Sequence, residues 1–155
     1  MPQIIKANSS NISEIKPLVL LLRREDNEET DEELTASLQK AIENNLLLVA
    51  VEQERVVGYI LGEFFGQTQV NFPNSIFISE LFVLPEFRSQ GIGKNLVRSF
   101  LSQKYPEEYE YFSLSHDPEE EHLSKYYENF GFVLTGNVLT GKTKSGNIMM
   151  RRARV

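Results

Sequence analysis

Two short glycine-containing segments have residue types that bind phosphate. Residues 136–143 read GNVLTGKT and fit the phosphate-loop pattern G-x-x-x-x-G-K-[ST] letter for letter. Residues 88–96 read RSQGIGKNL and carry a second pair, Gly91 and Gly93. A glycine turn that opens a helix binds phosphate because its backbone N–H groups and the helix dipole converge on the anion. The sequence therefore offers two alternative phosphate sites, and the choice between them decides the function.

The surroundings of GNVLTGKT do not fit a phosphate loop. Such a loop follows a strand and opens a helix. The residues after Thr143 read KSGNIMMRRARV, and Gly146 and Asn147 would interrupt a helix there. We therefore predict a glycine-bearing turn between two terminal strands, which argues against a nucleotide-hydrolysing protein.

The surroundings of RSQGIGKNL do fit a phosphate site. The apolar segment FISELFVL, residues 77–84, predicts a strand before it. A helix is predicted after it from the spacing of Ile92, Leu96, Val97, Phe100 and Leu101. Glycine lets the backbone approach an anion closely, and the N–H groups of about residues 90–95 are the unpaired donors of the helix start. A dinucleotide fingerprint needs a third glycine where Leu96 stands, so a Rossmann fold is not predicted.

Two signatures in register resemble the GNAT superfamily of N-acetyltransferases. Residues 79–97, SELFVLPEFRSQGIGKNLV, resemble its motif A, whose core pattern R/Q-x-x-G-x-G/A is matched by Arg88, Gly91 and Gly93. Residues 124–132, SKYYENFGF, resemble the second signature, in which Tyr127 precedes a Gly-Phe pair at a helix end. The element order matches the family over nearly the whole chain. The resemblance implies one N-acetyltransferase domain over residues 1–155 that uses acetyl-CoA.

By this resemblance, the glycine segment holds the pyrophosphate of coenzyme A, and the strand before it offers main-chain groups to the pantetheine arm. One N–H of that strand would polarise the thioester carbonyl. The expected cofactor-binding residues are Leu81, Phe82, Val83, Arg88, Ser89, Gln90, Gly91, Ile92, Gly93, Lys94, Asn95 and Ser124. Many relatives carry Asn at the position of Glu120, and the contact that this Asn makes with the pantetheine arm is expected either to be lost here or to be supplied by Ser124. A primary amine attacks the acetyl carbon directly, so no protein nucleophile is required.

Two side chains are candidates for the proton transfers. Tyr127 matches the family's general acid; the alternative is that it is one more ring in the apolar stripe of its helix. Glu80 is the candidate base, directly or through a water, because it interrupts an apolar strand and partial burial would raise its pKa. The alternative is a solvent-facing glutamate in an alternating strand. His116 and His122 are weaker candidates for the base.

The acceptor is expected to be a small cationic amine or a peptide. Residues 24–34, REDNEETDEEL, are dense in acids, and Glu25 and Asp26 are the candidates for binding the amine. Such acidic runs usually face water at helix starts. The main alternative function is a non-catalytic acyl-CoA-binding module that kept the glycine segment.

The composition argues against several classes of partner and site. The 155 residues carry a formal net charge of −6, which argues against nucleic-acid binding, and contain no cysteine, which removes disulfides and thiolate metal ligands. We predict no metal site. The longest apolar runs are too short to span a membrane, and no secretory signal is visible, so a cytoplasmic location is expected. Pairing or exchange of the terminal strands would give a homodimer.

The elements that must position these residues follow from periodicity and capping. The expected order is β-α-α-β-β-β-α-β-α-β-β, which predicts an α/β fold with a mixed, mostly antiparallel sheet, about four flanking helices and one crossover at the glycine segment. Capping boxes are predicted at Asn11 with Glu14 and at Thr30 with Glu33. Pro17 implies a kink or a late helix start. A further helix is predicted to begin at Asp117 and to end at Gly131.

Overall fold

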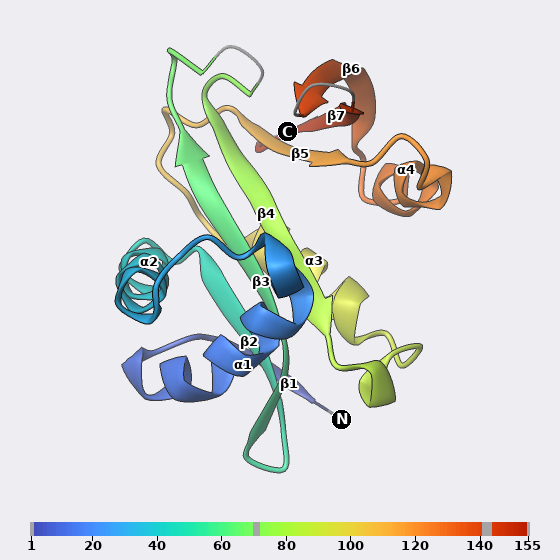
Figure 1. Cartoon of the computed structure of the whole chain (residues 1–155). Coiled ribbons are helices and arrows are strands. Elements are labelled where there is room, and N and C mark those ends of the chain that lie inside the picture. Colours follow the sequence, from blue (N-terminus) through green and yellow to red (C-terminus); the bar gives the residue numbers. More distant parts are fainter. Residues whose placement is uncertain (1, 70–71, 141–143, 155) are drawn as a thin grey trace. The chain divides into compact units, whose positions relative to one another are not determined.

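The structure is a computed structural model, and it describes residues 2–69, 72–140 and 144–154 (Figure 1). The helices are α1 (Ile12–Arg23), α2 (Asp31–Glu43), α3 (Ile92–Ser102) and α4 (Glu121–Glu128). The strands are β1 (Gln3–Lys6), β2 (Leu47–Glu52), β3 (Arg55–Phe65), β4 (Ser75–Val83), β5 (Tyr111–His116), β6 (Val133–Thr140) and β7 (Lys144–Arg152). This order confirms the predicted one. In the described ranges, no helix has the length and apolar character needed to cross a membrane.

The strands form a seven-stranded sheet in the order β1-β2-β3-β4-β5-β7-β6. β2 pairs antiparallel with β1 and β3, and β7 pairs antiparallel with β5 and β6. β4 and β5 pair in parallel, since the chain passes through α3 between them. The mixed, mostly antiparallel sheet with one crossover is therefore confirmed.

Backbone contacts group the chain into two compact units. The first comprises residues 1–62 and 80–103, and the second comprises residues 63–79 and 104–155. The candidate glycine segment belongs to the first unit, and Tyr127 belongs to the second. The single domain over residues 1–155 stays a prediction.

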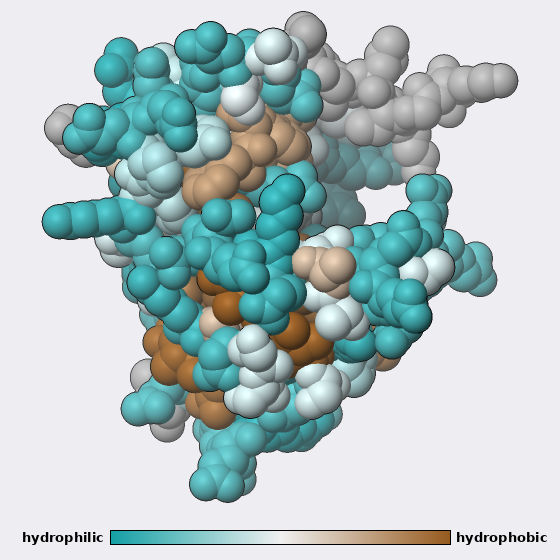
Figure 2. Space-filling view, turned by 90° about the vertical axis from the view of Figure 1, so that its left-hand side faces the viewer, coloured by the Kyte–Doolittle hydropathy of each residue, from teal (hydrophilic) through white to brown (hydrophobic). Residues whose placement is uncertain are grey.

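The first unit packs three helices against the strands β1 to β3. Helix α1 contacts α2, and both α2 and α3 contact β2. The two-residue turn between β2 and β3 has positive φ at Gln53 and Glu54, as in a type I′ hairpin. The core is made of aliphatic and aromatic side chains that are almost fully buried: Ile15, Val19, Leu38, Val49, Ile60, Leu96 and Phe100. Apolar side chains also reach the surface, and Figure 2 shows hydrophobic patches between hydrophilic ones on one face.

Helix α2 begins where its capping pattern predicts. The Thr30 hydroxyl accepts from the N–H of Glu33 at 3.1 Å, and the Glu33 carboxylate accepts from the N–H of Thr30 at 3.0 Å. Both orphan donors of the helix start are thereby satisfied, which confirms the predicted capping box. The apolar face of α2 is largely buried, with Ile42 half-buried and the others inside: Leu34, Leu38 and Ala41.

Asn11 stands in the N-cap position of helix α1, as predicted, but the capping box predicted for Asn11 and Glu14 is wrong, because the Asn11 side chain does not cap this helix. Asn8 instead caps a 3-10 turn in which the Asn11 side chain accepts from the N–H of Asn8 at 2.9 Å. Helix α1 continues directly from this turn at Ile12. Glu14 is therefore not needed as a capping partner, and its carboxylate accepts from the N–H of Val56 at 3.1 Å. Pro17 lies inside α1 and does not delay its start.

In the second unit, the predicted start of helix α4 is also wrong. The Asp117 side chain accepts from the N–H of Glu119 at 3.0 Å, and its carbonyl accepts from the N–H of Glu120 at 3.0 Å. Aspartate stabilises turns through its short side chain. Because the Asp117 side chain serves a turn here, it does not cap helix α4. Helix α4 begins at Glu121, with Glu120 in the N-cap position.

The predicted end of helix α4 is confirmed. Gly131 has φ of 92°, in the left-handed region that favours glycine. The N–H of Phe132 donates to the carbonyl of Tyr127 at 3.2 Å, and that of Gly131 donates to the carbonyl of Glu128 at 2.9 Å. These two bonds form a Schellman motif, which satisfies the last carbonyls and turns the chain into β6.

The segment GNVLTGKT lacks the setting of a phosphate loop. Strand β6 includes its first five residues, 136–140, and strand β7 begins at Lys144. The predicted turn falls on residues 141–143, which lie outside the described residues. Because a strand and not a helix begins at Lys144, no helix N-terminus follows the motif to receive a phosphate. The structure therefore does not support the nucleotide-hydrolysing alternative.

The left-handed Gly131 makes the end of α4 testable. We expect Gly131→Ala to lower the free energy of unfolding by about 1–2 kcal/mol, because an L side chain is strained at positive φ. A Cβ atom there would also lie 3.4 Å from Nε of Arg151. Urea unfolding measures the change, with Gly66→Ala as the control, since a Cβ at Gly66 meets no atom within 4 Å. Equal losses in both variants would contradict the assignment.

Candidate active site

The chain turns from β4 into α3 through residues that need special backbone conformations. The N–H of Leu84 donates to the carbonyl of Val57 at 2.9 Å, which holds the end of β4 beside β3. Pro85–Phe87 then forms a 3-10 turn. Ser89 and Gly91 both have positive φ, of 66° and 82°. Gly91 is the N-cap of α3, where its left-handed conformation is accessible without strain.

The first turn of α3 presents unpaired backbone donors. The first helical hydrogen bond runs from the N–H of Asn95 to the carbonyl of Gly91, at 3.0 Å. In the part of the chain that the structure describes, the N–H groups of Ile92, Gly93 and Lys94 have no partner. The Ile92 side chain is buried and anchors this turn in the core. Fixed N–H groups at the positive end of a helix form an anion-binding site.

The last residues of β4, Leu81–Val83, retain main-chain groups that a ligand can use. The described ladder between β4 and β5 takes up Ser75–Phe77 of β4, whereas β4 itself continues to Val83. On the other side, β3 comes very close: a Cβ atom on Gly58 would lie 2.9 Å from the carbonyl oxygen of Phe82. Glycine at position 58 therefore permits the close approach that fixes this stretch of β4.

Arg88 folds back over the end of β4. Its Nε donates to the carbonyl of Val83 at 2.8 Å, and its guanidinium lies 5.4 Å from the centroid of the Phe82 ring. The side chain is exposed, as are Ser89, Gln90 and Lys94. The bond to Val83 uses Nε, and a guanidinium carries further donors on its two Nη atoms that can contact an anion at the glycine turn.

Glu80 is held in a hydrogen-bond network. Its Oε2 accepts from Nε of Arg23 at 2.7 Å, and its Oε1 accepts from the hydroxyl of Tyr59 at 2.8 Å. The Glu80 side chain is 14% exposed, so the alternative of a solvent-facing glutamate is wrong. Burial, followed by the negative charge and the hydrogen bond of Glu80, raises the pKa of Tyr59. Tyr59 is thereby kept protonated as a donor to the carboxylate.

Arg23 joins two carboxylates. Its Nη1 lies 2.6 Å from Oε1 of Glu29 and 3.1 Å from the amide oxygen of Asn27. Burial lowers the pKa of Arg23, but the hydrogen bonds and charges of Glu80 and Glu29 outweigh this and raise it overall. The hydrogen bond from Ser37 and then the contact with Arg23 lower the pKa of Glu29. The ion pairs of Arg23 with Glu29 and Glu80 therefore fix the segment after α1, residues 24–30, to β4.

Glu25 and Asp26 lie within this fixed segment. They belong to the 3-10 turn Arg24–Asp26, and both are exposed. The turn directly follows Arg23, so it is tethered to Glu80 on β4 through the ion pair. The last turn of α1 also exposes a run of three leucines, residues 20–22. Exposed acidic side chains therefore directly follow exposed apolar ones where α1 ends.

Tyr127 belongs to the second unit and is 8% exposed. Its ring makes edge contacts with Tyr126 and Phe132, as expected for a ring in the apolar stripe of α4. Burial, followed by the influence of Tyr126, raises the pKa of Tyr127, so the phenol stays protonated. Among the described residues its hydroxyl has no hydrogen-bond partner. This leaves the proton available to a ligand.

The hydrogen bonds of His116 define the state of Ser124. The Nδ1 of His116 lies 2.9 Å from the Asp117 carbonyl oxygen, which can only accept, so a neutral ring carries its proton on Nδ1. Nε2 lies 2.8 Å from the Ser124 hydroxyl and then accepts from it. Ser124 is left with free oxygen lone pairs and acts as an acceptor. His116 is buried, and His122 is exposed.

Sequence reasoning missed Arg23, Tyr59 and Glu29, which surround the predicted base. One signal was present in the apolar strand VVGYILG, because a buried tyrosine hydroxyl must find a partner. Arg23 ends the run LVLLLR, and nothing in that run indicates that its guanidinium contacts Glu80. The hydrogen bond between Arg23 and Glu80 joins residues 57 positions apart in the chain, and no local pattern predicts it.

Comparison with known proteins identifies the family. A family profile described as Acetyltransferase (GNAT) domain matches residues 22–144. Among curated proteins, no sequence is significantly similar to this chain.

Solved structures match the fold over almost the whole chain at low identity. A ribosomal-protein-alanine N-acetyltransferase from Brucella melitensis has a TM-score of 0.79 and 15% identity, covering 97% of this chain and 99% of that chain. A GNAT-family acetyltransferase from Bacillus cereus has a TM-score of 0.73 and 17% identity, covering 98% and 97%. Naa50 from Arabidopsis thaliana, in complex with the bisubstrate analogue CoA-Ac-MVNAL, has a TM-score of 0.67 and 18% identity, covering 97% of each chain. With a profile match over most of its length, the chain belongs to the GNAT family of acetyl-CoA-dependent N-acetyltransferases.

Proposed function

We propose that this protein transfers the acetyl group of acetyl-CoA to a primary amine of a small cationic or peptide acceptor by direct attack. The observation that carries the proposal is the first turn of α3, where three N–H groups that find no partner among the described residues follow the left-handed Gly91. The pyrophosphate of coenzyme A fits such a turn because it needs several fixed donors. Ser89, Gln90 and Lys94 are exposed beside it, as are parts of Gly93 and Asn95.

The pantetheine arm and acetyl group of acetyl-CoA are bound by main-chain and side-chain groups. Leu81–Val83 supply backbone groups to the pantetheine arm, and one of their N–H groups stabilises the negative charge that develops on the acetyl oxygen. Ser124, fixed as an acceptor by His116, takes the place of the family's usual Asn, whose position is held by Glu120. Its oxygen can accept from an amide N–H of the arm.

Two proton transfers complete the reaction. Tyr127 donates to the leaving thiolate, since burial keeps its phenol protonated. Glu80 accepts the proton of the attacking amine, through a water. Its two oxygens each accept one hydrogen bond from the network, but an ionised carboxylate has about four acceptor sites, so it retains capacity. Arg23 and Tyr59 position it.

The acceptor site is proposed at the segment after α1. Glu25 and Asp26 supply negative charge for an ammonium group, and the exposed leucines 20–22 supply apolar contact. This combination suits a cationic amine with an apolar body, or the N-terminus of a peptide. The peptide class is also supported by the bisubstrate complex of Naa50. The single domain, a homodimer through the terminal strands and a cytoplasmic location remain parts of the proposal.

A panel of amines tests the proposed function. Coenzyme A release is measured with polyamines, amino acids, aminoglycosides and short peptides at fixed acetyl-CoA. We expect release above the no-amine rate with at least one cationic amine or peptide. Tight binding of acetyl-CoA without release in any arm would instead support the non-catalytic acyl-CoA-binding module.

Tyr127→Phe tests the proton donor. We expect turnover to fall by roughly 10²- to 10⁴-fold, the usual contribution of a general acid, with little change in acetyl-CoA affinity. A coenzyme A release assay measures turnover, and calorimetric titration measures the affinity for acetyl-CoA. Tyr109→Phe removes a phenol hydroxyl from the same unit and should leave both unchanged. Turnover that survives in Tyr127→Phe removes Tyr127 from this role.

Glu80→Gln tests the base against a purely structural role. We expect turnover to fall by roughly 10²-fold or more, because the neutral amide cannot accept the proton of the attacking amine. Glu29→Gln is the matched control, because it also removes one carboxylate partner of Arg23 but leaves Glu80 intact. If Glu29→Gln lowers turnover as much as Glu80→Gln, then Glu80 acts by holding the segment after α1 and not as the base.

A further inference from the structure

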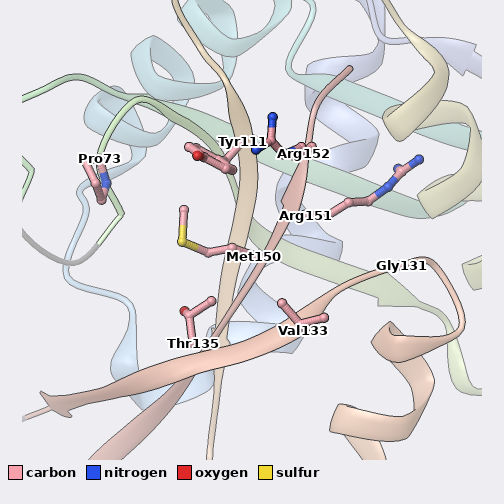
Figure 3. A pocket seen from close by; sticks show the side chains of 8 residues that line it. All are labelled: Pro73, Tyr111, Gly131, Val133, Thr135, Met150, Arg151 and Arg152. Carbon is pink, nitrogen blue, oxygen red and sulfur yellow. The ribbon is translucent and has the colours of Figure 1, made fainter. Parts of the chain in front are cut away.

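The second unit contains a hollow that the proposed acetyl transfer does not use. Its volume is about 710 Å³, within the usual range of roughly 300–1,000 Å³ for small-molecule pockets. The residues around it come from β5, β6 and β7, from the turn between α4 and β6, and from the connection between β3 and β4 (Figure 3). They are Pro73, Tyr111, Gly131, Val133, Thr135, Met150, Arg151 and Arg152. None of them belongs to the residues proposed to bind acetyl-CoA.

The register of the strands explains the composition of the hollow. Tyr111 is the cross-strand partner of Arg152, and Val133 is the partner of Met150. Since Met150 and Arg152 are two residues apart on β7, their side chains share one face of the sheet. A β-bulge between Leu134 and Gly136 leaves Thr135 out of regular pairing. Val133 is 59% exposed, so this apolar wall faces solvent.

Arg152 is the available cation of the hollow. It is exposed, and its guanidinium has no hydrogen-bond or ion-pair partner within the residues that the structure describes. Arg151 differs, because it lies over the ring of Phe112 at 5.8 Å and points away from Met150 in Figure 3. Arg154 also differs, since its Nη2 donates to the carbonyl of Glu107 at 2.6 Å. Among the described residues of the hollow, therefore, Arg152 supplies a guanidinium without a partner at the end of a mainly apolar surface.

We propose that this hollow binds a small monocarboxylate with an aliphatic or aromatic body. The carboxylate pairs with the planar guanidinium of Arg152, a geometry that favours two parallel hydrogen bonds. The apolar body covers Met150, Val133 and the ring of Tyr111, and its burial removes exposed apolar surface from water. A phosphate would leave these apolar walls uncovered, and an amine would be repelled by Arg152. The site is independent of the proposed acetyl transfer.

Binding of hexanoate to the intact protein tests the site. Calorimetry is run with excess coenzyme A, so that the anion site at the glycine turn is filled, and methyl NMR follows Met150 and Val133. We expect hexanoate to bind and to shift both methyl signals. The matched ligands hexan-1-ol and hexylamine should bind at least about tenfold more weakly, because they lack the charge-assisted pair. Equal binding of the alcohol would overturn the proposal.

Two variants and one control locate the contact. Arg152→Met should weaken hexanoate binding by about tenfold, as expected for the loss of one charge-assisted hydrogen-bonded pair. Arg154→Met removes the same charge from a guanidinium engaged elsewhere, and it should leave binding unchanged. Val133→Asp, at an exposed position, should abolish binding while the melting temperature stays near that of the parent protein. Unaltered hexanoate affinity in Arg152→Met, or displacement of hexanoate by coenzyme A, would overturn the proposal.

Discussion

The turn from β4 into α3 is the constraint on which the account of function depends. The chain must leave a buried strand and start a helix anchored by the buried Ile92. It does so with left-handed backbone at Ser89 and Gly91. The geometry leaves three helix-start N–H groups without a partner in the described part of the chain, next to a stretch of β4 outside the described ladder with β5. An anion-binding turn and a strand edge thus follow from one local path of the chain.

A second constraint, the ion pair of Arg23 with Glu80, connects this strand to the segment that carries Glu25 and Asp26. Two carboxylates around one guanidinium satisfy its desolvated charge, which a single partner would do less well. The same contact serves two purposes in the proposed function. It holds Glu80 in one orientation with Tyr59, and it fixes the acidic segment relative to the first unit's core.

The sequence predicted the parts of the fold that are encoded locally. Helical and strand periodicity, the capping box at Thr30 and the glycine stop at Gly131 are all present. The wrong capping box at Asn11 and the misplaced start of α4 have a common cause, because short polar side chains cap turns as readily as helices. The network around Glu80 was not predicted, since it joins residues from α1, β3 and β4 that share no sequence pattern. The segment GNVLTGKT matches the phosphate-loop pattern letter for letter, but it lacks the strand-to-helix setting that such a loop needs.

The most direct test of the central claim is an amide NMR titration of the protein with coenzyme A. The claim predicts that the largest shifts occur at the N–H groups of Gly91–Lys94, because they become donors to the pyrophosphate. It also predicts that the amides of residues 136–140 move little. Large shifts at residues 136–140 with silent amides at Gly91–Lys94 would contradict the account.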